Sequence, residues 1–537
     1  MLNFPMALAL SSFLHSPHRQ FLAADDELTA SVAEIQVLPS QKASNDSQSA
    51  ENTGSELALP EDILFHVHTL MPMRDAARAA CVSRVFLNSW RCYPRLTLDT
   101  ETLGIHLDTD EEEEKIESDF VSRVDHIMQN HSGNGLKKVK IRTHPCRNLH
   151  PSNVDRCLQI AISPGIEEFE LQIYRRRNME YDFPSSLLTT ARGSSIRSFV
   201  LTYCAFHSTM TVGCLSSLAR VYLRCVHITG DELYCFLSNC PALEQLDLSN
   251  CSDMIFLKIP HLLIQLNLLW VQHCHKLQMI EANAPKLRDF NYTGMPIHIS
   301  LGDSSQVRVI EMHCEHESRM IYFARTKLPS IAPNLQILHL SSCNETINIP
   351  MITGKFNCLK YLELEIMLQL SSLSPDFDFH SLVSFLDASH ALETFILRVE
   401  APALQHDVVL EYSEADSSRP GCLSGYRHEK LRNMMITGFC SAKSMIELTN
   451  HILEKTVSLE CLTLDTTRGH DRRLVMIDKC LRMSKEAVME AEKACLSIRR
   501  HIQGRVPSTV NLKVIEPCST CHTLEKCYDA LQYTQFL

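Results

Sequence analysis

Apolar residues recur at a fixed spacing through most of the chain. From about residue 136 the sequence repeats the pattern L-x-x-L-x-L, in which any aliphatic or aromatic residue takes the three apolar places. The alternation at the end of the pattern predicts a short strand with one buried face. The copies begin 20 to 39 residues apart, at Leu136, Ile166, Ile196, Leu218, Leu243, Leu266, Leu287, Val307, Leu335, Leu359, Leu392, Leu431 and Leu459. A strand repeated at this period buries its apolar face only by stacking on its neighbours.

Several copies carry a cysteine three places after the last apolar residue. Cys204, Cys251, Cys274 and Cys343 take this place. This is the signature of a leucine-rich repeat, with its Asn/Cys position. The predicted fold class is therefore α/β, a solenoid of parallel strands in the shape of a horseshoe. Ser484 to Ile502 predicts a capped amphipathic helix that covers the C-terminal end of the solenoid.

A helical pattern precedes the repeats, between Leu59 and Leu98. Pro60 suits the first turn of a helix, and the acidic pair after it favours the positive helix N-terminus. Ile63, Leu64 and Leu70 then follow at helical spacing, and two more apolar clusters predict two further short helices. Three such helices carry more apolar surface than about forty residues bury alone, so the unit needs a partner to cover it.

This helical segment resembles an F-box, the unit that docks a substrate receptor onto the Skp adaptor of a Skp–cullin–F-box ubiquitin ligase. The matching features are Leu59-Pro60-x-Asp62-Ile63-Leu64, then Leu70-x-Pro72 with Asp75, and Val82-Ser83-Arg84 followed by Trp90. Phe86 stands where the family usually has tryptophan, and His66 and His68 lie in a helix that is more often aliphatic. The resemblance implies an adaptor-binding set made of Leu59, Pro60, Ile63, Leu64, Leu70, Pro72 and Val82.

A second resemblance lies near the C-terminus. Residues 428–465 are similar to the FBD-type region of plant F-box/leucine-rich-repeat proteins, on Leu431, Ile436-Thr437-Gly438-Phe439, the helical stretch from Met445 to Leu453, and Ser458-Leu459-Glu460. The predicted organisation is a disordered leader (1–55), the F-box (56–98), an acidic linker leading into the solenoid (99–135), the repeats (136–410), a surface loop (411–428), FBD-type terminal repeats with the capping helix (429–515), and a Cys-containing tail (516–537).

Composition and charge narrow the class of protein. A hydrophobic share of 45% with 21% charged residues is globular, and the net charge of −12 argues against a general nucleic-acid binder. No apolar run approaches the length of a membrane span, and no positive charge precedes the short apolar stretch near the N-terminus, as a secretory signal requires. The 22 cysteines lie mostly in apolar motifs, as reduced buried thiols do. These features predict a protein of the cytoplasm, the nucleus or both.

Three short motifs contain residues that can bind metal. Cys518-Ser519-Thr520-Cys521-His522 matches the attachment pattern of c-type haem, and with Cys527 it offers four soft ligands for zinc. His273-Cys274-His275 and His313-Cys314-x-His316 alternate along predicted strands, so that neighbours face opposite sides of the sheet. A reduced tail and exposed repeat histidines are the favoured interpretations. We therefore predict no metal site, no cofactor and no catalytic residue.

Polar residues between the apolar places of each strand predict a surface on the concave side of the solenoid. Trp270, one of only two tryptophans, faces outward in this scheme, as a binding hot spot does. The predicted target-binding residues are Tyr222, Arg224, Asp247, Trp270, Gln272, Asn291, Glu311, His313, His339 and Glu363.

The functional hypothesis follows from these two surfaces. The chain is expected to be the non-catalytic substrate-recognition subunit of a Skp–cullin–F-box E3 ubiquitin ligase, with a Skp-type adaptor, through it a cullin, and a target protein as partners. One alternative is a leucine-rich-repeat scaffold that binds the adaptor without promoting turnover. A lesser alternative is a metal-binding protein built on the C-terminal Cys/His cluster. The identity of the target and any small ligand or target modification stay open.

Overall fold

The structure is a computed structural model that describes most of the chain after the leader. The described residues are 60–105, 113–132, 135–174, 180–188, 193–207, 215–302, 304–317, 319–343, 345, 354–367, 378–400, 427–467 and 483–518. The predicted leader (1–55), Leu59, and almost all of the predicted surface loop and tail lie outside them.

The first three helices within the described residues occupy the places that the helical pattern predicts. They are α3 (Glu61–Leu70), α4 (Met73–Val82) and α5 (Arg84–Trp90). Pro60 and Pro72 are the N-cap residues of α3 and α4. The helix makes no hydrogen bond with the amide at this position, so proline loses nothing there. Acidic residues fill the first turns of both helices, where they complement the helix dipole.

After these helices, the described chain builds one long parallel sheet of 15 strands. Each of the thirteen predicted strands is present and pairs with its neighbours. In order, the strands are β1 (Arg95–Leu98), β2 (Lys138–Arg142), β3 (Glu168–Gln172), β4 (Ser198–Thr202), β5 (Arg220–Arg224), β6 (Gln245–Ser249), β8 (Leu268–Gln272), β10 (Asp289–Thr293), β12 (Val309–Glu317), β13 (Ile337–Cys343), β14 (Tyr361–Met367), β15 (Thr394–Glu400), β16 (Asn433–Thr437), β17 (Cys461–Asp465) and β18 (Asn511–Ile515). The predicted α/β class with a leucine-rich-repeat solenoid is confirmed.

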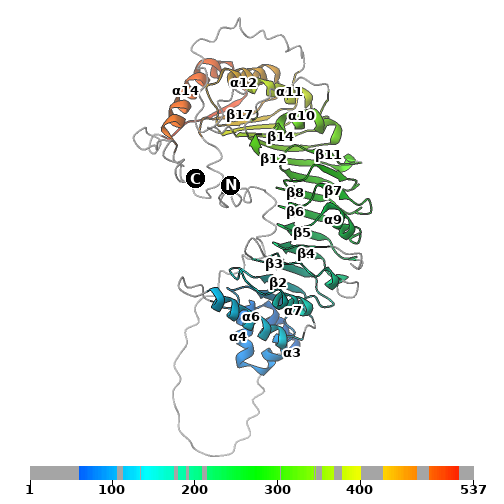
Figure 1. The fold of residues 1–537 in the computed structure, drawn as a ribbon. Helices are drawn as coiled ribbons and strands as arrows, with labels where there is room; N and C mark the ends of the chain where they lie inside the picture. Colours follow the sequence, from blue (N-terminus) through cyan, green and yellow to red (C-terminus); the bar gives the residue numbers. More distant parts are fainter. Residues whose placement is uncertain are drawn as a thin grey trace, which may run out of the picture. The chain divides into compact units, whose positions relative to one another are not determined.

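Helices and a small second sheet return the chain between these strands. The small sheet contains β7 (Phe256–Ile259), β9 (Met279–Ala282) and β11 (His298–Ser300). Figure 1 shows β7 and β11 on the same side of the long sheet as helices α7, α9 and α10. The return helices are α6 (Glu113–Asn130), α7 (Pro151–Ala161), α9 (Gly230–Leu237), α10 (Met320–Ile331), α11 (Val383–Ala388), α12 (Lys443–Lys455) and α14 (Lys485–His501), with 3-10 turns η3 (Ser185–Leu187), η4 (Ser304–Gln306), η5 (Phe379–Leu382) and η7 (Gln503–Arg505). None of the described helices is long and apolar enough to span a membrane.

The core lies between the long sheet and these return segments. The second and fourth residues of the strands point into it, as Leu246 and Leu248 of β6 do, both fully buried. Cysteines at the Asn/Cys position close the turn after the strand: the Cys251 thiol donates to the carbonyl of Leu223, 3.5 Å away in β5. Asn250 just before it has a φ of +56°, a left-handed conformation that asparagine tolerates. The sequence prediction that these cysteines are buried is confirmed.

The long sheet extends beyond the predicted repeats at both ends. Arg95–Leu98, which falls inside the range predicted for the F-box, forms β1 and pairs with β2 in parallel. At the other end, the helix predicted from Ser484 to Ile502 forms as α14, with the Ser484 hydroxyl accepting from the amide of Ala487. The chain then continues into β18, which pairs with β17. The sheet therefore has one strand more at each end than the repeat pattern predicts, and β18 forms its C-terminal edge.

Candidate functional site

The interior of the helical unit is organised by a buried histidine. His68 is fully buried, its Nε2 donates to the carbonyl of Ala76 at 2.9 Å, and its Nδ1 lies 2.8 Å from the Ser89 hydroxyl. Its ring stacks on Phe86 with the ring centroids 5.0 Å apart. Two of the departures from the F-box pattern, His68 for an aliphatic residue and Phe86 for tryptophan, thus pack on each other and tie the three helices together.

The same unit packs directly on the first strand of the sheet. Met73, Ala76 and Ala80 of α4 are buried in the core that also contains Leu96 and Leu98 of β1. The Tyr93 hydroxyl donates to the carbonyl of Met71 at 2.7 Å, and the Arg95 guanidinium donates to the carbonyl of Thr69. The helices are therefore held against the solenoid by apolar contacts and by polar contacts.

The outward side of the helical unit is apolar and exposed. Val82 is 86% exposed and Leu70 is 65% exposed, values that are high for large aliphatic side chains of a folded protein. Pro60, Ile63 and Pro72 are also exposed, and Leu64 is half-buried, so every described member of the predicted adaptor-binding set has accessible surface. Further exposed apolar residues, not predicted from the sequence, extend this surface: Phe65, Val67, Val85 and Leu87. We call the whole set the apolar helical surface.

A second surface lies on the long sheet, opposite its core. We call it the open face; it consists of the first, third and fifth residues of each strand. The parallel register places the predicted target-binding residues in two straight rows on this face. The third-position row contains Tyr222, Asp247, Trp270, Asn291, Glu311, His339 and Glu363, and the fifth-position row contains Arg224, Gln272 and His313. The predicted orientation of these side chains is confirmed.

Three of these residues are buried within the open face. Asp247, Asn291 and Glu363 are at most 8% exposed, because side chains of the neighbouring strands cover them and bond to them. Asp247 accepts from Arg224 at 3.2 Å, and the Asn291 amide donates to Glu311 at 2.7 Å. These three of the ten predicted residues are therefore buried, and they position their neighbours.

Glu363 is the centre of a charged network at β13 to β15. It accepts from the Tyr361 hydroxyl at 2.7 Å, lies 3.3 Å from His339 Nδ1, and accepts from the guanidinium of Arg398. Burial raises the pKa of the Glu363 carboxyl, but the hydrogen bonds from His339, Arg398 and Tyr361 outweigh it and hold this pKa at about 2. Glu363 is therefore ionised at all physiological pH values. Arg398 was missed by the sequence analysis, although its fifth position in β15 continues the predicted row.

The exposed part of the open face combines aromatic, polar and charged side chains. Tyr222, Trp270, Gln272, Glu311, His313 and His339 are all half-buried. Burial lowers the pKa of His313, which keeps its ring neutral at physiological pH in spite of the acidic groups near it. Such a surface suits recognition of a polar partner around an aromatic anchor.

The described residues offer no metal centre. No group of three or more His, Cys, Asp or Glu side chains in the described residues is arranged to hold an ion. The rings of His273 and His275 are 6.2 Å apart, and His273 lies in a left-handed turn after β8, not on a strand as predicted. Of the tail motif, only Cys518 falls within the described residues, so the predictions made for Cys521, His522 and Cys527 lie outside them.

Comparison with known proteins gives the same architecture. Residues 127–519 match the family model described as "At1g61320/AtMIF1, LRR domain". This match covers most of the chain, from the last turn of helix α6 to just beyond β18. The chain belongs to this leucine-rich-repeat family. The remaining N-terminal part contains the three-helix unit and β1.

The curated relatives come from Arabidopsis thaliana. A protein named as an F-box/FBD/LRR-repeat protein, At5g56810, is 23% identical over 447 residues, which are 80% of this chain and 94% of that protein. The F-box/LRR-repeat protein At4g14096 is 23% identical over 36% of this chain and 39% of its own length. A third, At3g18150, named as an F-box/LRR-repeat protein, is 21% identical over 58% of this chain and 62% of its own length. The recognition of the chain as similar to plant F-box/FBD/LRR-repeat proteins is confirmed.

The FBD-type region is part of the solenoid in this structure. Strands β16, β17 and β18, with helices α12 and α14 between them, continue the long sheet in the register of the repeats before them. Gly438, in the predicted Ile-Thr-Gly-Phe step, has a φ of +70° in the turn after β16. The region therefore consists of terminal repeats, as its two L-x-x-L-x-L copies indicate.

Proposed function

We propose that this chain is the substrate-recognition subunit of a Skp–cullin–F-box E3 ubiquitin ligase. The observation that supports the proposal is the apolar helical surface, which stays uncovered in the described residues on a unit that resembles an F-box. A Skp-type adaptor is the partner that this resemblance implies. Each large apolar side chain covered there contributes roughly 1.5–3 kcal/mol when fully buried, and association costs roughly 4–15 kcal/mol, so micromolar affinity requires a partner to cover most of this surface.

In this proposal the chain selects the target protein and brings it close to the ligase, and other subunits catalyse the transfer of ubiquitin. The adaptor links the chain to a cullin. The open face holds a target protein close to a ubiquitin-conjugating enzyme that carries ubiquitin. The chain itself then needs no nucleophile, metal or cofactor. Residence in the cytoplasm or the nucleus belongs to the same proposal, and microscopy of a fluorescent fusion in plant cells tests it.

Adaptor binding is tested by one substitution and a matched control. Val82→Glu places a charge on the apolar helical surface, at a position so exposed that the fold tolerates it. Val457→Glu is the control, because Val457 is also an exposed valine, at 61%, but lies after α12. Calorimetry with a purified Skp-type adaptor is expected to show about a tenfold or greater loss of affinity for Val82→Glu and no change for Val457→Glu.

Two results would contradict this proposal. If the unaltered chain does not bind the adaptor, the helical unit only caps the solenoid. If it binds but the abundance of no cellular protein changes when Val82→Glu replaces the unaltered chain in cells, the protein is a scaffold that engages the adaptor without promoting turnover. Metal analysis of the full chain, with and without residues 516–537, tests the lesser alternative of a metal-binding tail.

A further inference from the structure

Two cysteines take the Asn/Cys position in neighbouring turns of the solenoid. Cys251 follows β6 and Cys274 follows β8, and each is the second residue after its strand. Within the described residues, no other two neighbouring turns both carry a cysteine at this position. Cys204, for example, lies beside Val226 of the next turn. This position therefore brings two thiols together only at Cys251 and Cys274 in the described chain.

The backbone holds these two turns side by side. Strands β6 and β8 pair in register up to their last residues. The next residues, Asn250 and His273, both have a left-handed φ, +56° and +53°, so the two turns have the same shape. The amide of Asn250 donates to the carbonyl of Gln272 at 2.8 Å. Cys251 and Cys274 are therefore one strand spacing apart, about 4.8 Å, within the range of roughly 4.4–6.8 Å that Cα atoms span across a disulfide.

The two side chains also point in the same direction. Cys251 Sγ lies 3.5 Å from the carbonyl oxygen of Leu223, and Cys274 Sγ lies 3.9 Å from that of Leu248. Leu223 and Leu248 pair in register, so the two thiols make the same contact one strand apart. They are also hydrogen-bonded to each other. Thiols form weak hydrogen bonds, so little is lost when the two sulfur atoms leave these carbonyls and approach each other.

The two thiols differ in acidity and in access. The hydrogen bond with Cys251 lowers the pKa of the Cys274 thiol, although burial raises it. The same hydrogen bond and burial raise the pKa of the Cys251 thiol. Cys274 is 6% exposed, whereas Cys251 is fully buried. Because the thiolate is the form that reacts with peroxides, Cys274 is the cysteine of the pair that is oxidised first.

We propose that Cys251 and Cys274 form a site of reversible oxidation, at which hydrogen peroxide converts the two thiols into a disulfide. The Cys274 thiolate attacks one oxygen of the peroxide and the O–O bond breaks; with the proton that the thiol released, a sulfenic acid and water form. The Cys251 sulfur then attacks the Cys274 sulfur, and the S–O bond breaks to release a second water. The thiols give up two protons and two electrons, and the peroxide is reduced to water. This inference is independent of the proposed function.

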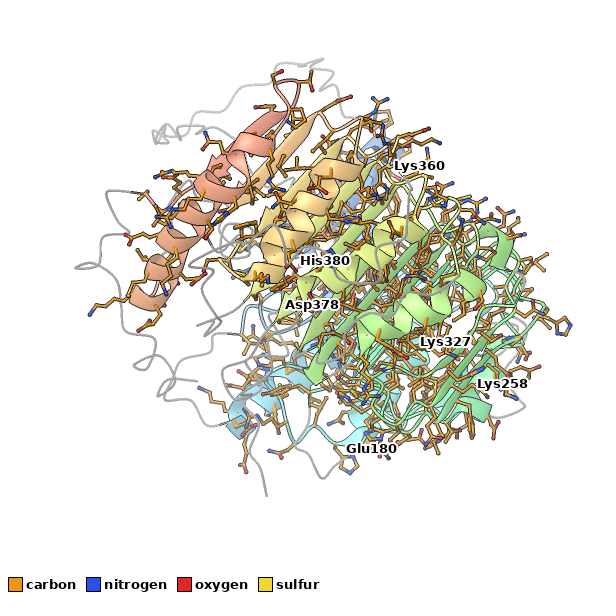
Figure 2. The ribbon with its side chains drawn as sticks, turned by 90° about the horizontal axis from the view of Figure 1, so that it is seen from above. Glu180, Lys258, Lys327, Lys360, Asp378 and His380 are labelled. Atoms are coloured by element: carbon orange, nitrogen blue, oxygen red, sulfur yellow. The ribbon has the colours of Figure 1, made fainter. Side chains whose placement is uncertain are left out.

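The disulfide joins two neighbouring repeats covalently. It closes a loop, residues 251–274, that contains strand β7. Lys258 of this strand is labelled in Figure 2, where it lies at the margin of the ribbon. A cross-link that closes a loop restricts the unfolded chain, so the oxidised protein should unfold at a higher urea concentration than the reduced protein.

The test is peptide mapping of the full chain after treatment with hydrogen peroxide. Free thiols are alkylated in denaturant before digestion. Trypsin then places Cys251 in peptide 225–258 and Cys274, as its only cysteine, in peptide 259–276. We expect the two peptides to be joined, with a mass two hydrogens below the sum of the reduced peptides and with fragmentation locating the bond at Cys251. Dithiothreitol should separate them.

Single variants separate the roles of the two thiols. Cys274→Ala should form no disulfide and leave Cys251 as a free thiol. Cys251→Ala should leave a sulfenic acid at Cys274, which dimedone traps. Cys204→Ala is the matched control, because Cys204 is also a buried thiol at the Asn/Cys position but has no cysteine beside it there. This control should form the disulfide as the unaltered chain does.

Two results would overturn the inference. In the first, Cys251 and Cys274 both stay free at a peroxide concentration that already oxidises the exposed Cys81. In the second, Cys274 is joined to a cysteine other than Cys251, such as Cys225 of the same tryptic peptide. Both results are obtained with the unaltered chain, so the test does not depend on whether a variant folds.

Discussion

A buried glutamate at the start of helix α10 should make the stability of the protein fall as pH rises. Glu345 is fully buried, and its Oε2 accepts from the Ser342 hydroxyl at 2.8 Å and from the amide of Ile321 at 3.1 Å. Its Oε1 is buried without a hydrogen-bond partner within the described residues. Burial raises the pKa of this carboxyl to about 7, although the bonds from Ser342 and Ile321 lower it.

The sign and size of the effect follow from linkage. The folded pKa of about 7 lies above the ordinary value of 4.5, so the folded state holds the proton more tightly than the unfolded chain does. The stabilisation from this proton is complete below pH 4.5 and is lost as pH rises through 7. Between pH 5 and pH 8 the loss amounts to about 2.5 kcal/mol of unfolding free energy.

Glu345→Gln removes this pH dependence. The amide has nearly the shape of the protonated acid, and its oxygen can still accept from Ser342 and Ile321. In urea titrations followed by circular dichroism, the variant should become more stable relative to the unaltered chain by about 2.5 kcal/mol on going from pH 5 to pH 8. Glu460→Gln is the control, since the Glu460 side chain is 64% exposed and pairs only with an exposed arginine. An equal difference at both pH values would refute the reasoning.

Three further predictions concern the backbone, the open face and the helical unit, with urea titration as the measurement for the first two. Gly438→Ala should cost more than about 2 kcal/mol, because φ is +70° and an added Cβ would clash with a backbone carbonyl oxygen of β15, whereas Gly504→Ala has open space and should be neutral. Arg398→Met should cost about 3–5 kcal/mol by leaving Glu363 buried without its cation, and adding Glu363→Gln should recover most of the loss. His68→Ala should speed hydrogen exchange in residues 60–90 by removing two buried contacts, and leave the repeats after β5 unchanged.

The sequence predicts most of the fold because each copy of the L-x-x-L-x-L pattern specifies one strand of the long sheet. The two strands that it missed have local causes. In β18 the apolar residues Leu512 and Val514 are present, but Thr509 takes the first apolar place of the pattern. In β1 the pattern is complete from Tyr93 to Leu98, but it overlaps the segment that resembles an F-box. The strands of the second sheet have three or four residues, too few for alternation to distinguish them from turns.

The candidate surfaces were predictable in direction but not in accessibility. Alternation along a strand gives the side of the sheet on which Asp247 or Glu363 lies. Whether such a residue meets solvent depends on the strands beside it, which the pattern of a single strand does not contain. The same limit applies to His68, whose burial the sequence of its own helix does not reveal. Its ring nitrogens are satisfied by Ser89 and by the carbonyl of Ala76, which belong to the other two helices.

The shared core of the helical unit and β1 bears on how proteins of this kind can exchange parts. Met73 of α4 lies against the strand, and the amide of Thr97 in β1 donates to its sulfur at 3.2 Å. A gene segment that ended after α5 would encode the helices without Leu96 and Leu98, which share the core with their buried residues. Recombination that joins a docking unit to a new set of repeats would therefore have to carry the first strand with it. The segment that could be exchanged intact therefore consists of the helices together with β1, and the first suitable recombination boundary lies after that strand.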